Sequence, residues 1–342
     1  MPIPGRAHEC VLVFLSLSAV LPWTAGCDEL TSQAEVGYSY DCPVARHDRW
    51  DAHPPHTSVD DWSDPLRLIA PLNSPCPEDS IKIAPNGLDL YFTFSTDLLQ
   101  NLAQDEVMAA PTGTYRARRL GGPEFFGEVA FYDLGKGANR SADGSLSFSP
   151  DGRLVFFQSL RDGNLGFQAG AAAAENLDIY ASDLLDGTPG PARNLGFPVN
   201  SEFLDGDEEI HPDNRSLYFT SSRPGGVGGK DIWCSQWRGN GWSPPETVGA
   251  PLNSELDDTQ PTFSADGNTM FFASTRAEWL GPAIYRSERQ ADDTWGEPEL
   301  VIRGHVGSPS LTSDDRFMYF VHYLADAGGS FDVDVWYSVR QP

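Results

Sequence analysis

A ten-residue block that recurs five times constrains the fold of this chain more than any other feature. The copies begin at Ile83, Phe148, Ile210, Phe263 and Leu311 and read IAPNGLDLYF, FSPDGRLVFF, IHPDNRSLYF, FSADGNTMFF and LTSDDRFMYF. In each copy a strand ends, a tight turn follows, and an aromatic strand begins, which is the pattern of a β-hairpin. Five copies in sequence predict one supersecondary unit repeated around or along an axis.

Each block is followed by segments that read as two further strands. Third strands are indicated at Asp178–Tyr180, Asp231–Trp233 and Asp334–Trp336, and fourth strands at Trp242–Pro245 and Trp295–Pro298. Four antiparallel strands per repeat make one blade of a β-propeller. We therefore predict an all-β fold with about five four-stranded blades. A sixth blade remains an alternative if residues 28–60 or 121–143 contain a degenerate copy.

The order of the segments also indicates how the propeller closes. Asp61–Pro65 resembles a fourth strand, yet it precedes the first block, whereas the last repeat ends after its third strand. The N-terminal strand can therefore complete the final blade, which removes two exposed strand edges. We place the propeller domain at residues 61–342.

These repeats resemble the TolB-type, WD-repeat-like propellers of bacterial envelopes. The resemblance covers about residues 60–342 and rests on the pattern Ser-Pro-Asp-Gly, Phe-Phe, Ser-x-Arg and Asp-Ile-Tyr within residues 149–180. The first repeat departs from it by lacking Ser-x-Arg, and the fourth has Ala283 in place of the usual Asp. The resemblance implies partners in envelope complexes, although a fold does not fix a function.

The N-terminus carries the features of an export signal. Arg6 precedes an apolar run from Cys10 to Leu21 that is too short to span a membrane, and Thr24-Ala-Gly-Cys27 follows. This last motif resembles a bacterial lipobox, with Thr24 standing where Leu is usual. We expect a signal peptide at residues 1–26, lipidation of Cys27, and a tether over residues 27–60. The expected location is the cell envelope, periplasmic or at the cell surface. Ordinary cleavage, giving an unanchored exported protein, is the alternative.

Export permits disulfide bonds among the remaining cysteines. If Cys27 is acylated, Cys42 and Cys76 form a candidate pair that would staple the N-terminal arm to the first repeat. Cys234, between Trp233 and Ser235, is expected to be a buried thiol.

The formal net charge of −26 excludes nucleic acid as the main partner, because duplex binding requires an excess of Lys and Arg. We expect no cofactor. The acidic run Asp205–Glu209 could attract calcium, but the EF-hand pattern is absent.

Topology places the loops before the first strand and after the second strand of every blade on one face. Carboxylates lie five residues ahead of four blocks, where they could form a partial acidic ring at the channel mouth. The candidate ligand or partner face comprises Glu78, Asp143, Asp205, Asp258, Arg161, Arg223, Arg276, Trp279 and Tyr323. The alternative is that these carboxylates cap turns or pair with the arginines.

We expect a lipid-anchored, non-catalytic scaffold that binds a protein, peptide or glycan. The alternative is a carbohydrate- or peptide-active enzyme that uses the acidic channel mouth, with His211 and His322 as further candidates. No Gly-x-Ser-x-Gly nucleophile motif is present, and no catalytic or metal-binding residue is predicted.

Overall fold

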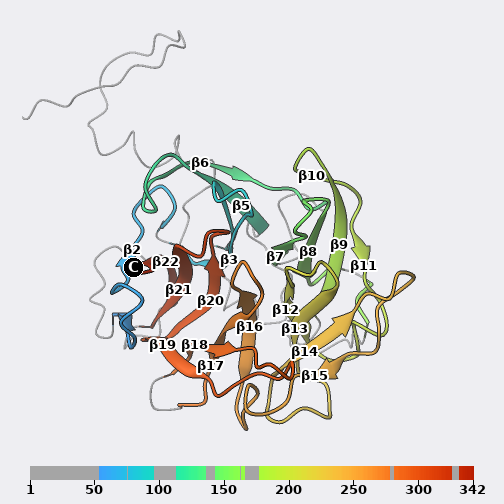
Figure 1. The fold of residues 1–342 in the computed structure, drawn as a ribbon. Coiled ribbons are helices and arrows are strands. Elements are labelled where there is room, and N and C mark those ends of the chain that lie inside the picture. The colour runs from blue at the N-terminus through green and yellow to red at the C-terminus, as the bar shows by residue number, and fades with distance from the viewer. Residues whose placement is uncertain are drawn as a thin grey trace, which may run out of the picture.

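The fold is a five-bladed β-propeller. The computed structural model describes residues 54–74, 76–95, 113–135, 143–161, 163–165, 177–277, 281–325 and 331–342. Within these ranges there is no helix, and so none that could cross a membrane. Five antiparallel sheets surround a common centre, with β3, β7, β12, β16 and β20 innermost (Figure 1). The predicted fold class and five blades are confirmed.

Apart from the strands that the N-terminal segment adds to blades four and five, the strands of each blade follow one another in the chain. Blade one contains β3 (Glu78–Ile83), β4 (Asp89–Phe94), β5 (Gly113–Arg119) and β6 (Phe126–Phe131). Blade two contains β7 (Gly144–Phe148), β8 (Leu154–Ser159), β9 (Asp178–Leu185), β10 (Thr188–Pro189) and β11 (Arg193–Asn194). Blade three contains β12 (Asp205–Ile210), β13 (Ser216–Ser221), β14 (Asp231–Gln236) and β15 (Glu246–Thr247). Blade four contains β16 (Asp258–Phe263), β17 (Thr269–Ser274), β18 (Ala283–Glu288) and β19 (Glu299–Arg303). Blade five contains β20 (Val306–Leu311), β21 (Phe317–Ala325) and β22 (Phe331–Val339).

The predicted hairpins join the first and second strands of every blade. Gly87, Gly152 and Gly267 have positive φ angles of 66°, 68° and 74°, and Asn214 and Asp315 take the same turn position at 56° and 54°. Glycine reaches this region without a steric penalty, and Asn and Asp reach it more readily than other residues. The last residue of each block is a fully buried phenylalanine; these are Phe92, Phe157, Phe219, Phe272 and Phe320.

Each innermost strand contains a β-bulge. The residues at the bulges are Ser80, Ser145, Asp207, Gln260 and Ser308, all with φ between 47° and 55°. The strand pairing shifts register at the same point in all five blades. A bulge re-aims the side chains around it, so this position shapes the lining of the central channel.

The fourth strands of blades three and four lie later than predicted. Trp242 forms an isolated bridge with Trp237, and the regular pairing begins at β15 (Glu246–Thr247). Trp295 likewise forms only a bridge, and β19 begins at Glu299. Proline has no N–H to donate to a ladder. The prolines after each tryptophan therefore delay the strand.

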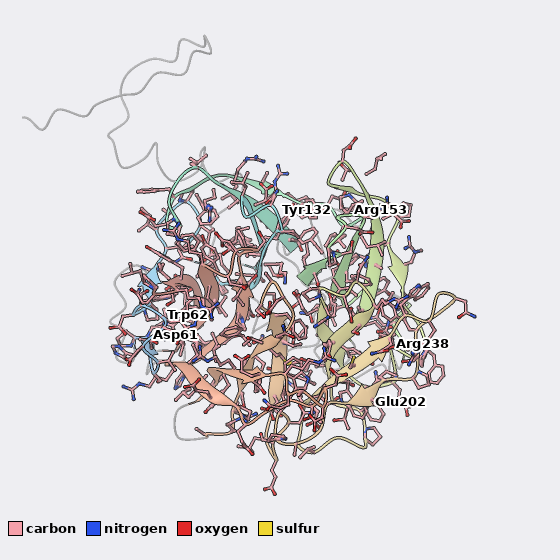
Figure 2. All side chains as sticks on the ribbon, in the orientation of Figure 1. Asp61, Trp62, Tyr132, Arg153, Glu202 and Arg238 are labelled. Atoms are coloured by element: carbon pink, nitrogen blue, oxygen red, sulfur yellow. The ribbon has the colours of Figure 1, made fainter. Side chains whose placement is uncertain are left out.

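The N-terminal segment closes the propeller, as predicted. Trp62 bridges Arg340, and β2 (Leu66–Arg67) pairs with β22 as the fourth strand of blade five. The ladder itself thus lies just beyond the predicted Asp61–Pro65. A second strand, β1 (His56–Thr57), precedes the predicted domain start and adds a fifth strand to blade four. Trp62 is 2% exposed and packs edge-on against Phe271, beside the closure seen in Figure 2.

Candidate functional site

The carboxylates predicted to ring the channel mouth are buried, and three of them pair with the arginines of their own blades. Asp205 in blade three shows the arrangement: it accepts hydrogen bonds from Ser221 Oγ at 2.6 Å and from Arg223 Nη2 at 2.5 Å. Arg223 Nε also donates to Ser221 Oγ at 2.9 Å. The guanidinium stacks over Phe219 and Trp233. We call this arrangement the Arg–Ser–Asp clamp.

The same clamp occurs in blades two and four. Arg161 Nη2 contacts Asp143 at 2.7 Å, and Arg276 Nη2 contacts Asp258 at 2.6 Å. In both blades the arginine stacks on two rings, Phe157 and Tyr180 in blade two and Phe272 and Tyr285 in blade four. Hydrogen bonds and the paired charge offset the cost of burying these carboxylates. In the structure, Asp143, Asp205 and Asp258 therefore form ion pairs with arginines of their own blades, which is the alternative interpretation of these carboxylates.

Blade one lacks the clamp. Phe94 pairs opposite Glu78 where the other blades have serine, and Thr96 stands in the sequence where they have arginine. Glu78 is fully buried, hydrogen-bonded to Ser74, and its Oε2 atom has no partner. Burial raises the pKa of Glu78 well above its usual range, and the nearby carboxylates of Asp334 and Asp332 raise it further.

Blade five replaces the clamp altogether. Val306 and His322 pair at the register where other blades have Asp and Ser, and Leu324 follows where they have Arg. His322 is buried and packs edge-on against Trp336. The fold thus tolerates a blade without the Arg–Asp pair at this position.

A second repeated element, Pro-x-Asn-Ser, precedes blades one, three and four and was missed by the sequence reasoning. Asn200 Nδ2 donates to Ile179 O at 2.8 Å, and its Oδ1 accepts from Ile179 N at 2.9 Å. Asn253 with Ile232 and Asn73 with Val335 repeat this pair of bonds. The Pro-x-Asn-Ser motif recurs at residues 71–74, 198–201 and 251–254, and this repetition could have identified it from the sequence.

Several predicted residues lie outside the described ranges. Cys27, Cys42 and Trp279 are among them. Cys76 is buried and disulfide-bonded, and the described residues do not include its partner. Cys234 is a free thiol.

Charged side chains from blades one and three line the central channel: Lys82, Asp207, Glu208 and Glu209. Lys82 Nζ of blade one spans to Glu209 of blade three, with N–O distances of 2.5 and 2.6 Å. The cavity beside this pair has a volume of about 30 Å³, roughly the room that one water molecule needs.

A second group of side chains lies at the level of the bulges. Burial raises the pKa of Asp79 to about 6 and also raises that of Asp207. Tyr323, predicted on the partner face, lies near both carboxylates, and burial raises its pKa as well. Gly307 faces the Tyr323 hydroxyl so closely that a Cβ there would lie 2.9 Å from it.

A groove of about 800 Å³ lies on the seam between blades two and three. Its lining includes the hairpin residues Asp151 and Asn214, so it opens on the face opposite the predicted one. Its apolar wall contains Phe197, which is 85% exposed, and the mutually packed Trp237 and Trp242. We call this cavity the seam groove.

Charged residues in the seam groove are balanced. Arg193 pairs with Asp183 at 2.6 Å, and Arg153 lies 4.0 Å from Asp151. The groove therefore carries no net charge on a strongly acidic chain. The sequence feature that could have pointed to the groove is the second tryptophan in Trp237-Arg-Gly-Asn-Gly-Trp242. Blade four has only Trp295 at the equivalent positions, with Arg289 in place of Trp237.

In the ranges that the structure covers, no group of three or more His, Cys, Asp or Glu side chains is arranged to hold a metal ion. His211 of the enzyme hypothesis is buried; its Nε2 lies 3.1 Å from Gly267 O and its Nδ1 accepts from Asp213 N. Its ring contacts are Tyr218 and Phe263. These contacts show that His211 packs between blades three and four.

No protein-family model matches this chain, and no curated protein matches it. Among solved structures it is similar to a glycoside hydrolase, with a TM-score of 0.54 and 9% identity over 82% of this chain and 92% of the other. It is also similar to a thermostable family-43 glycoside hydrolase, with a TM-score of 0.50 and 12% identity over 78% and 91%. A TolB-like protein of Agrobacterium tumefaciens matches with a TM-score of 0.44 and 16% identity over 79% and 92%. At such identities the likeness concerns the propeller fold alone.

Proposed function

We propose that this protein is an exported, lipid-anchored propeller that binds an envelope protein, peptide or glycan without catalysis, and that the seam groove is its binding site. The observation that carries the proposal is the groove itself. It combines exposed aromatic rings with paired Arg–Asp groups and asparagine amides on a rigid scaffold. Sites that bind ligands commonly join apolar walls to a few convergent polar groups.

The clamps support this choice of face. Because Asp143, Asp205 and Asp258 are at most 5% exposed and bonded within their blades, they offer a partner little surface. Phe197 and Trp237, by contrast, expose large rings without which the blades could still pack. Aromatic residues are the side chains that most often dominate binding energy at interfaces.

The test compares the full chain with a Phe197→Ala/Trp237→Ala variant in binding to peptide and glycan arrays and to envelope fractions. Loss of both rings should weaken binding by at least about thirtyfold, because one aromatic hot spot alone contributes about 2 kcal/mol or more. Phe125→Ala, which removes an exposed ring on blade one, is the matched control. Unchanged binding by the groove variant would refute the assignment of the groove.

The anchor is tested separately. A Cys27→Ser variant should leave the membrane fraction and should no longer incorporate a labelled fatty acid. Retention of the variant in the membrane would contradict anchoring through Cys27. Multiple acyl chains are needed for a stable anchor, so loss of this cysteine should release the whole chain.

The enzyme alternative rests on the converging carboxylates Asp79 and Asp207. Glycosidases use paired carboxyl groups of unequal pKa. The channel cavity that Asp207 lines has a volume of about 30 Å³, whereas ligand pockets typically have about 300–1,000 Å³. Turnover of chromogenic glycosides that is abolished by Asp79→Asn would nevertheless establish this function against the binding proposal.

A further inference from the structure

Glu208 differs in kind from the residues at its position in the other blades. Ile81, Leu146, Pro261 and Pro309 occupy that position, all apolar and all lining the central cavity. Glu208 lines the same cavity, is 3% exposed, and neither of its carboxyl oxygens has a hydrogen-bond partner. An ionised carboxylate buried without a partner is strongly destabilising. No hydrogen bond from the described residues offsets the cost of burying the Glu208 carboxylate, so another interaction must do so.

The neighbouring charges do not neutralise Glu208. Lys82 interacts electrostatically with Glu208, but both carboxyl oxygens of Glu209 already contact the Lys82 ammonium. Asp207 adds a further carboxylate, which accepts a hydrogen bond from Ser145 Oγ at 3.0 Å. Burial raises the pKa of Glu208 well above its usual range, and Asp207 and Glu209 raise it further. When Asp207, Glu208 and Glu209 are all ionised, Lys82 offsets only one of their three charges, so an ionised Glu208 leaves the cavity with an excess of negative charge.

The free polar atoms that face the cavity are oxygens. Ser308 Oγ, from blade five, is buried near Asp79 and Tyr323. Neither it nor the two oxygens of Glu208 from blade three has a hydrogen-bond partner of ordinary geometry among the described residues. No histidine or cysteine lines the cavity. Its volume of about 30 Å³ suits one water-sized occupant. Oxygen donors favour hard cations such as Na⁺, K⁺ and Ca²⁺ and disfavour zinc, which prefers nitrogen and sulfur.

We propose that one hard cation binds in the central channel, held by the carboxylate of Glu208 and by Ser308 Oγ. It links blades three and five across the axis and offsets the charge of Asp207 and Glu208. Since no cluster of three or more acidic or imidazole side chains surrounds it in the described residues, we expect a dissociation constant on the order of 10⁻⁴ to 10⁻³ M, as for loosely held calcium. The ion is structural, and the site is independent of the seam groove.

The experiment measures the melting temperature of the chelator-treated full chain in choline chloride and, at equal ionic strength, in NaCl, KCl, CaCl₂ and MgCl₂. Binding to the native state alone should raise the melting temperature by about 5 °C at saturating cation. Glu208→Gln keeps the shape and removes the charge, so the cation-specific increment should vanish. Glu202→Gln, an exposed carboxylate on the same blade, should retain it.

A third variant keeps the test informative if Glu208→Gln fails to fold. Glu208→Leu introduces the residue that blade two has at this position, and it should melt no lower than the cation-free wild type. Two outcomes overturn the proposal. Either no cation stabilises the wild type beyond choline, or Glu208→Gln retains the full increment. In the first case a protonated Glu208 with a buried water accounts for the cavity.

Discussion

Removal of the guanidinium from one clamp tests the account of the blades most directly, and Arg223→Leu in blade three is the change of choice. Asp205 is fully buried and Arg223 is 11% exposed in its side chain, so the variant leaves a carboxylate in the protein interior without its cation. Breaking a buried pair in this way costs about 3–5 kcal/mol. Loss of stacking on Phe219 and Trp233 adds to this cost.

For a domain of this size, 1 kcal/mol corresponds to about 2–4 °C in melting temperature. We therefore expect Arg223→Leu to lower it by about 10 °C, measured by circular dichroism and checked by urea unfolding. The matched control is Arg193→Leu, because Arg193 pairs with Asp183 at almost the same distance, 2.6 Å, but both side chains are more than half exposed. An exposed pair contributes about 0–1 kcal/mol, so this variant should melt within about 3 °C of the wild type.

Blade five supplies a second comparison, since Val306 and Leu324 replace the charged pair there. The Asp205→Val/Arg223→Leu double variant should consequently be less destabilised than Arg223→Leu alone, because it leaves no buried charge. Equal melting temperatures for Arg223→Leu and Arg193→Leu, or a double variant that melts no higher than Arg223→Leu, would refute this reasoning.

Three further predictions concern the channel, the closure and the free thiol. Because burial raises the pKa of Asp79 from 3.8 to about 6, the native state binds the extra proton and stability should fall as pH rises between these values; Asp79→Asn should flatten that part of a urea-derived profile. Trp62→Ala should cost about 3–5 kcal/mol in denaturant unfolding, because the ring is buried at the closure, whereas Trp237→Ala, at an exposed ring, should cost far less. Burial raises the pKa of Cys234 to about 12, so this thiol should resist a thiol reagent at pH 8 in the native protein and react once the chain unfolds.

Much of the fold could be predicted from local patterns. The five hairpin blocks, their turn residues and the third strands follow from short stretches of sequence, because a turn such as Asp151-Gly152 and the alternation around it act over a few residues. Closure was also predictable, since the N-terminal segment around Trp62 supplies the strand that the last repeat lacks. The fourth strands of blades three and four begin a few residues later than predicted. The prediction relied on Trp242 and Trp295, whereas the prolines that follow each tryptophan cannot donate a ladder hydrogen bond.

The chemistry of the site depended on contacts that the sequence does not reveal. Equal spacing of Asp143, Asp205 and Asp258 predicted a common ring, but whether each carboxylate faced solvent or its own Arg was set by side-chain direction within the blade. The seam groove joins Arg153 of one blade to Trp237 of the next, and the channel joins Lys82 to Glu209 across the axis. Repetition determines which unit forms and how often. How neighbouring units face one another depends on packing between residues far apart in the chain. That packing also decides whether a buried charge has a partner of opposite charge.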